Sequence, residues 1–131
     1  CSSDLKSMTE VGIVIVSHSK WIAQGLVDLI SEVAKDVVLT YVGGTEDGGI
    51  GTSFEQVQTI VEANEAEKIL AFFDLGSARM NLELVADFSD KDIIINNVPI
   101  VEGAYTTAAL LQAGADLATI QEQLKELEIK K

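Results

Sequence analysis

The stretch from Val11 to Ser19, VGIVIVSHS, decides the fold class, because an apolar run leads directly into three polar residues. All but one of the residues 11–16 are β-branched, which is typical of a strand buried on both faces of a sheet. The residues that follow recur at helical spacing on one face, at Ile22, Leu26, Leu29, Ile30 and Val33. This stretch therefore predicts a strand, a polar turn and a helix, the first unit of an α/β protein.

The same order recurs along the chain. Further β-branched or apolar runs predict strands at 37–42, 68–73 and 92–95. Helices are expected after Ser53, after Ser77, at about 101–113 and from about Asp116. Repeated β-α-β connections imply parallel strands with right-handed crossovers. We expect an open, doubly wound, mainly parallel sheet of about four strands flanked by helices, with the first strand between the second and the third.

Length and composition fit one domain. The chain has 131 residues, of which 47% are hydrophobic, enough for a single core and too few for two ordinary domains. Residues 1–7 precede Met8 and are expected to be a leftover of an expression vector, so that residues 8–131 form the domain.

Charge and cysteine usage narrow the classes of partner. The formal net charge of −12 disfavours nucleic-acid binding, because a phosphate-rich polymer is repelled. Cys1 is the one cysteine, so no intramolecular disulfide can form. A chain without disulfides fits a reducing compartment. The apolar runs are too short for membrane insertion. We therefore expect a cytoplasmic protein.

Polar or flexible residues follow all four expected strands. His18 follows the first strand, a loop with five glycines (43–52) the second, Asp74 the third, and Asn96 and Asn97 the fourth. The carboxyl ends of parallel strands meet at one edge, so these residues are expected to share one rim. Such a rim can supply a nucleophile, a group that orients it and donors for phosphate oxygens.

His18, the only histidine, is the candidate nucleophile. Neutral imidazole has a free nitrogen lone pair near pH 7 and can attack phosphorus. Asp74 is the candidate that accepts a hydrogen bond from the other ring nitrogen and fixes the tautomer. Two plainer interpretations stay open: an ordinary histidine at the start of a helix, and an aspartate that only shapes a turn.

Several groups could contact a phosphoryl group at this rim. The candidates are hydroxyls, helix-start amides, loop residues and one cation: Ser17, Ser19, Gly76, Ser77, Ala78, Gly43, Gly44, Thr45 and Arg79. The glycine loop lacks the Gly-Lys-Ser/Thr of a Walker motif and fits a flexible connection equally well. One histidine and one terminal cysteine cannot form a zinc site, and we expect no metal or other cofactor.

The residues Val11–Ser19 and Asn97-Val98-Pro99 resemble the mannose-type enzyme IIA domains of the bacterial phosphotransferase system. Three more stretches resemble the phosphotransferase subunits of dihydroxyacetone kinases within that family: FDLGSARMN (73–81), GGTEDGGIGTS (43–53) and VEGA (101–104). The resemblance extends over nearly the whole chain from Met8. It implies that His18 is the phosphoacceptor, through a phosphohistidine intermediate, and that Asp74 is its orienting carboxylate.

The resemblance also implies partners. The phosphocarrier protein HPr would phosphorylate His18, and the phosphoryl group would pass to ADP bound on a nucleotide subunit, DhaL. The ATP formed would phosphorylate dihydroxyacetone held on DhaK. The family is usually dimeric, so a homodimer is expected. Because the chain ends at Lys131, without the HPr-like domain fused in some relatives, we expect it to use a separate HPr.

Three alternatives remain at this point. The acceptor could be a sugar-specific IIB protein in place of DhaL. The protein could be a receiver-like domain phosphorylated on Asp74, although receivers need an acidic pair where Ser17 and His18 stand. It could also be an α/β ligand-binding module without covalent chemistry.

Overall fold

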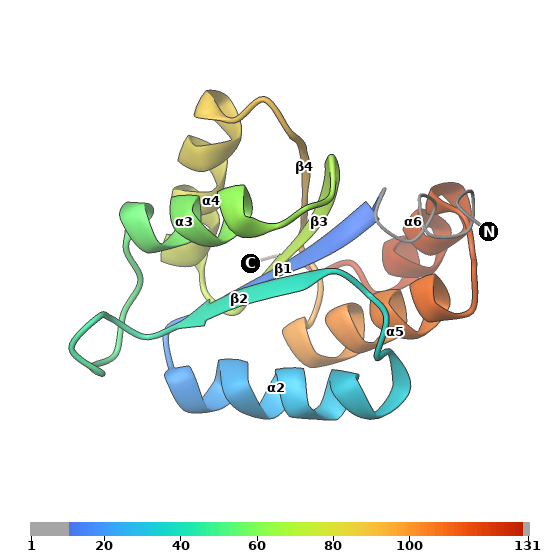
Figure 1. Cartoon of the computed structure of the whole chain (residues 1–131), viewed down its shortest axis with the longest axis horizontal. Helices are drawn as coiled ribbons and strands as arrows, with labels where there is room; N and C mark the ends of the chain where they lie inside the picture. The colour runs from blue at the N-terminus through green and yellow to red at the C-terminus, as the bar shows by residue number, and fades with distance from the viewer. Residues whose placement is uncertain (1–10, 130–131) are drawn as a thin grey trace.

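The computed structural model describes residues 11–129, so the expected vector-derived residues 1–7 lie outside it. Strands and helices alternate along this part of the chain until two helices follow one another (Figure 1). The strands are β1 (Val11–Ser17), β2 (Leu39–Gly43), β3 (Lys68–Phe73) and β4 (Asp92–Asn96). The helices are α2 (Lys20–Val33), α3 (Phe54–Ala63), α4 (Gly76–Phe88), α5 (Ile100–Gln112) and α6 (Leu117–Glu126).

The sheet confirms the expected topology. Its strand order is β2-β1-β3-β4, and all neighbouring strands are parallel. The first strand lies between the second and the third, so the chain reverses its direction of travel across the sheet between β2 and β3. The crevice at this reversal opens at the carboxyl ends of β1 and β3, as expected for a doubly wound sheet.

Helices cover both faces of the sheet, α3 and α4 on one and α2, α5 and α6 on the other (Figure 1). Side chains of a strand point alternately to the two faces, and β1 and β3 supply apolar residues to both. Ile13, Ile15 and Phe72 pack with α2, α5 and α6, whereas Val14 and Val16 pack with α3 and α4. This two-sided burial explains why the central strands carry uninterrupted apolar runs.

Two expectations need correction. The second strand begins at Leu39, later than the expected residue 37. The reason is that Gln112 holds Asp36 in a turn: the Gln112 side chain accepts a hydrogen bond from the Asp36 amide at 2.9 Å. The inward face of α2 is also rotated from the one expected. Ala23, Leu26 and Ile30 are buried there, while three members of the expected stripe, Ile22, Leu29 and Val33, are 38–47% exposed.

Candidate active site

The pairing of β1 with β3 brings His18 beside Asp74. Val16 pairs with Phe73 in this register, and both strands end immediately afterwards. His18 then lies in the turn before α2, and Asp74 in the turn before α4. Residues 56 positions apart in the sequence thus meet at the carboxyl edge of the two central strands.

The Asp74 carboxylate binds His18 through both of its oxygens. His18 Nδ1 lies 2.8 Å from Oδ1, and the His18 amide donates to Oδ2 at 2.9 Å. A carboxylate oxygen can only accept, so the hydrogen of the neutral ring belongs on Nδ1. The two side chains are only 14% and 12% exposed, which keeps this pair in one orientation. Nε2 is then the nitrogen with the free lone pair.

The surroundings of Asp74 favour its ionised form. Burial acts to raise the pKa of this carboxyl, but hydrogen bonds from the His18 amide, the His18 ring and the Ser17 hydroxyl outweigh burial and hold the pKa below its usual value. Asp74 is therefore a carboxylate at neutral pH. Its charge is placed to stabilise a positive charge that develops on the His18 ring.

Ser77 faces the nucleophilic nitrogen. It is the second residue of α4, and its hydroxyl oxygen makes a short contact with His18 Nε2. With the ring hydrogen on Nδ1, the Ser77 hydroxyl is the donor and Nε2 the acceptor. Helix α4 begins at Gly76, so its first amides and the positive end of its dipole lie on the same side of the ring.

The two serines that flank His18 are already engaged in other hydrogen bonds. We expected both hydroxyls to donate to phosphoryl oxygens. Ser17 is 1% exposed, and its hydroxyl donates to Asp74 Oδ2 at 2.9 Å. The Ser19 hydroxyl caps α2 by accepting from the Trp21 amide at 3.2 Å. The phosphate contacts of both serines stay predictions. The structure gives the Ser17 hydroxyl hydrogen to Asp74, whereas the Ser19 hydroxyl hydrogen is not used in the cap.

The glycine loop is fastened to the end of β1. The Gly44 amide donates to the Ser17 carbonyl at 3.1 Å, and the Gly51 amide donates to the His18 carbonyl at 2.8 Å. Gly43 packs against the start of α2, where an added Cβ would lie 2.5 Å from the Ser19 carbonyl oxygen. Glycine is needed at 43 for this close approach and at 44 for a φ of +77°. The loop therefore supports the backbone around His18.

Three of the expected phosphate contacts make other bonds. The Thr45 hydroxyl contacts Asp47 and accepts from the Gly49 amide within the loop. Ala78 is fully buried, and its amide donates to the Leu75 carbonyl at 3.0 Å. The Arg79 guanidinium lies 3.3 Å from the Glu83 carboxylate, one turn along α4. The contacts of these three residues with a phosphoryl group or a partner stay predictions, and the Ala78 amide closes the first turn of α4 in this structure.

Two supporting contacts were not singled out from the sequence. The Gly51 amide holds the His18 carbonyl, and the Asn81 side chain donates to the Thr52 hydroxyl at 3.3 Å, which ties the loop to α4. The order of parallel strands could have suggested the first contact, since residues after β2 must lie beside residues after β1. The second contact depends on the path of the loop, which no local pattern encodes.

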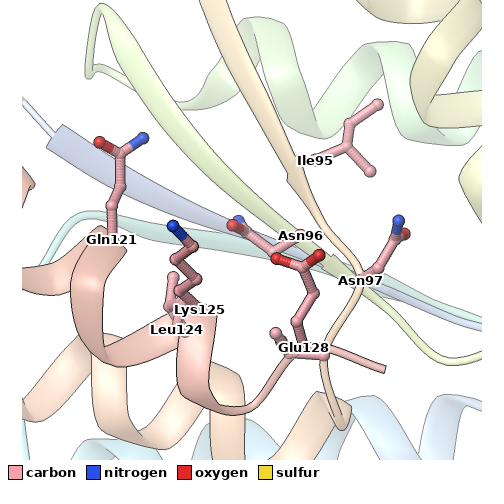
Figure 2. Close-up of a pocket in the computed structure, with 8 residues that line it drawn as sticks. Ile95, Asn96, Asn97, Gln121, Leu124, Lys125 and Glu128 are labelled. Atoms are coloured by element: carbon pink, nitrogen blue, oxygen red, sulfur yellow. The ribbon is translucent and has the colours of Figure 1, made fainter. Parts of the chain in front are cut away.

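A hollow of about 380 Å³ lies elsewhere, between β4 and α6. Figure 2 shows residues that line it, among them Gln121, Lys125 and Glu128 from α6 and the residues after it, and Asn96 and Asn97 at the end of β4. Neither His18 nor Asp74 lines this hollow. The expected convergence of polar residues at one rim therefore holds for His18 and Asp74, while Asn96 and Asn97 line a different cavity.

Within residues 11–129, no group of three or more His, Cys, Asp or Glu side chains is arranged to hold a metal ion. In the same part of the chain, no helix has the length and apolar character needed to cross a bilayer.

Comparison with known proteins places this arrangement in a family. Residues 12–121 match the family model EIIA-man, described as the fructose IIA component of the phosphotransferase system. A protein of Lactococcus lactis is 59% identical over 120 residues, which is 92% of this chain and 98% of that protein. That protein is named as DhaM, the phosphotransferase subunit of a dihydroxyacetone kinase that depends on the phosphotransferase system. A DhaM phosphoryl donor subunit of Listeria innocua is 54% identical, over 91% of this chain and 96% of its own length.

More distant relatives and solved structures are similar to this chain as well. The DhaM of Escherichia coli is 28% identical over 92% of this chain, but the match spans only 28% of that longer protein. Among solved structures, a protein of unknown function superposes with a TM-score of 0.80 at 29% identity, covering 92% of this chain and 97% of that one. A sigma-54 interaction domain protein of Enterococcus faecalis, at a TM-score of 0.69 and 12% identity, shows the same fold.

Proposed function

This chain belongs to the mannose-type enzyme IIA family of the bacterial phosphotransferase system, and we propose that it is the phosphotransferase subunit of a phosphoenolpyruvate-dependent dihydroxyacetone kinase. In this role it carries a phosphoryl group on His18. One observation supports the carrier role above all. The Asp74 carboxylate, 2.8 Å from Nδ1, holds the ring so that the lone pair on Nε2 is directed outward at Ser77.

The first transfer takes the phosphoryl group from phospho-HPr. The Nε2 lone pair of His18 attacks phosphorus, a P–N bond forms to Nε2, and the P–N bond to the donor histidine breaks with its electron pair returning to the donor. The His18 ring gains positive charge as the bond forms. Asp74 stabilises this charge, and the ring hydrogen stays on Nδ1 throughout.

Groups of α4 receive the phosphoryl oxygens. When phosphorus occupies Nε2, the Ser77 hydroxyl can no longer donate to that nitrogen and turns to a phosphoryl oxygen. The amides of Gly76 and Ser77 at the helix start and the positive end of the helix dipole favour the added negative charge. These groups offset the repulsion expected from an acidic protein.

The second transfer delivers the group to a nucleotide. An oxygen of the β-phosphate of ADP, bound on DhaL, attacks phosphorus, and the P–Nε2 bond breaks with its electron pair returning to His18. The ATP formed then phosphorylates dihydroxyacetone on DhaK. The names of the two relatives at 59% and 54% identity, both subunits of a dihydroxyacetone kinase, support an acceptor within such a kinase. Cytoplasmic localisation and a homodimer stay predictions.

A second acceptor deserves a test because the matched family model describes a sugar-system IIA component. In that case the phosphoryl group of His18 would pass to a IIB protein. Discharge by a IIB protein, with none by DhaL and ADP, would favour this candidate.

The phosphocarrier role is tested by intact-mass measurement. The protein is incubated with enzyme I, HPr and phosphoenolpyruvate, beside a His18→Ala variant checked for folding by circular dichroism. We expect one acid-labile phosphate on the wild type, none on the variant, and loss of the label when DhaL and ADP are added. A folded His18→Ala variant that still takes up phosphate would refute the role of His18.

A further inference from the structure

The side chain of Ser17 is buried directly before the nucleophile. It is 1% exposed, although it ends a strand at the edge that carries the active site. Its hydroxyl donates to Asp74 Oδ2 at 2.9 Å and accepts from the Ser19 amide at 3.2 Å. The single hydroxyl hydrogen is therefore engaged, and the oxygen is closed off from solvent.

The Asp74 carboxylate divides its two oxygens between two sets of donors. Oδ2 accepts from the Ser17 hydroxyl and the His18 amide, both from the end of β1. Oδ1 accepts from the His18 ring and from the Leu75 amide at 2.8 Å. Three of these four donors are fixed by the backbone or by the ring that must be oriented. The Ser17 hydroxyl is the one separate side chain that fixes the rotation of the carboxylate.

Ser17 also connects the three segments that surround His18. Its hydroxyl accepts from the residue that caps α2, and its carbonyl accepts from Gly44 of the glycine loop at 3.1 Å. A change in the rotamer of Ser17 would therefore disturb Asp74 and the start of α2 together. This arrangement suits a residue that holds the site in place without reaching the reacting atoms.

We propose that Ser17 is a positioning residue for phosphoryl transfer, whose buried hydroxyl locks the Asp74 carboxylate in the rotation that keeps hydrogen on Nδ1 and the lone pair on Nε2. The inference rests on the proposed function of His18. It assigns to Ser17 an action through Asp74, in place of direct contact with the phosphoryl group. Without the hydroxyl, Oδ2 keeps only the His18 amide as a donor, so the carboxylate is held less tightly and the ring samples the other tautomer more often.

The test combines kinetics with a spectroscopic measurement on the same variants. Ser17→Ala removes the donor, Ser17→Cys keeps much of the volume with a weak donor, and Ser17→Thr keeps the hydroxyl. Ser89→Ala is the matched control, because Ser89 lies at the end of α4, away from His18. Its hydroxyl accepts one hydrogen bond, from the Lys91 amide at 3.1 Å. The initial rate of phosphorylation by phospho-HPr is measured for each folded variant.

Nitrogen-15 NMR gives a second readout that a merely structural role would not move. The chain has one histidine, so the ring signals need no assignment between residues. We expect the Nδ1–H tautomer to dominate in the wild type and in Ser89→Ala. In Ser17→Ala and Ser17→Cys the share of the Nε2–H tautomer should rise, while the phosphorylation rate falls roughly tenfold. Ser17→Thr should restore both quantities toward wild type.

The outcomes separate the inference from the proposed function. Wild-type rate and wild-type tautomer in Ser17→Ala, or in Ser17→Cys if the alanine variant fails to fold, would overturn the positioning role. The same holds if the rate falls but the tautomer is unchanged, since Ser17 would then act in some other way. The tautomer is measured without any phosphoryl donor, so it tests Ser17 even if His18 proves not to be phosphorylated.

Discussion

The His18 edge and the hollow between β4 and α6 form an instructive contrast. The hollow measures about 380 Å³ and is lined by amide, ammonium and carboxylate groups. His18 and Asp74 line neither this hollow nor two others around the glycine loop and α3. They are, however, joined by two hydrogen bonds of 2.8 and 2.9 Å.

The difference lies in preorganisation. At the His18 edge, donors and acceptors are paired so that one nitrogen lone pair is held outward. In the hollow, the side-chain oxygen of Asn97 is buried without a hydrogen-bond partner in the described part of the chain. A site that receives a phosphoryl group from another protein needs an exposed, oriented atom more than it needs a cavity.

The largest effect is expected for Asp74→Asn. The amide cannot hold the Nδ1–H tautomer in the same way and cannot neutralise the positive ring, so the rate of phosphorylation of His18 should fall on the order of 100-fold. Rapid-quench measurement with phospho-HPr gives this rate, with circular dichroism as the check on folding. An unchanged rate would show that Asp74 only shapes the turn before α4.

A smaller effect is expected for Ser77→Ala. The variant loses the hydroxyl that faces Nε2 but keeps the helix-start amides, so the transfer rate should fall roughly tenfold or less. The phosphorylated form should also lose its phosphoryl group to water at a different rate, because one donor to the phosphoryl oxygens is gone. Equal transfer and hydrolysis rates in variant and wild type would remove Ser77 from the site.

The pKa of Asp74 predicts a pH effect on stability. The pKa of Asp74 is lowered in the folded protein from its ordinary value of 3.8. Ionised Asp74 therefore adds stability above that value, and this stability is lost as the pH falls through the lowered folded pKa. Urea unfolding between pH 5 and pH 3 should thus show a steeper fall in the free energy of unfolding for wild type than for Asp74→Asn. Parallel curves would contradict the lowered pKa.

The smallest effect is expected in the hollow. Lys125→Ala removes its cation, which lies on α6 away from His18, and should change the phosphorylation rate less than about twofold. Lys68→Ala, at the start of β3, provides a matched loss of charge at another place. A large loss of phosphorylation rate in Lys125→Ala, but not in Lys68→Ala, would show that the hollow takes part in the transfer reaction.

The fold was predictable because its signals are local and repeated. The apolar runs of β1 and β3 identify buried strands, and the alternation with helices makes them parallel. The alternation does not determine the strand order: the place of β1 between β2 and β3 was chosen among the orders known for doubly wound sheets, and the structure confirms it. The start of β2 and the buried face of α2 were missed for a tertiary reason. The Gln112 side chain fixes the turn at Asp36, and α2 buries the small Ala23 in place of the larger Ile22.

The candidate site was predictable to the level of His18 beside Asp74. Both follow central strands directly, and the parallel register brings strand ends together. The roles of Ser17 and Ala78 were not predictable, because a hydroxyl or an amide near a strand end can serve a ligand or the protein itself. The observed partners, Asp74 Oδ2 and the Leu75 carbonyl, are atoms of the protein itself.

The central claim is that the phosphoryl group bonds to Nε2 of His18. Phosphorus-31 and nitrogen-15 NMR of the phosphorylated, nitrogen-15-labelled protein tests it most directly, because the coupling between phosphorus and a ring nitrogen identifies the bonded atom. The account predicts one phosphorus signal coupled to Nε2, with hydrogen still on Nδ1. Phosphorus coupled to Nδ1, or bound to the Asp74 carboxylate, would contradict it.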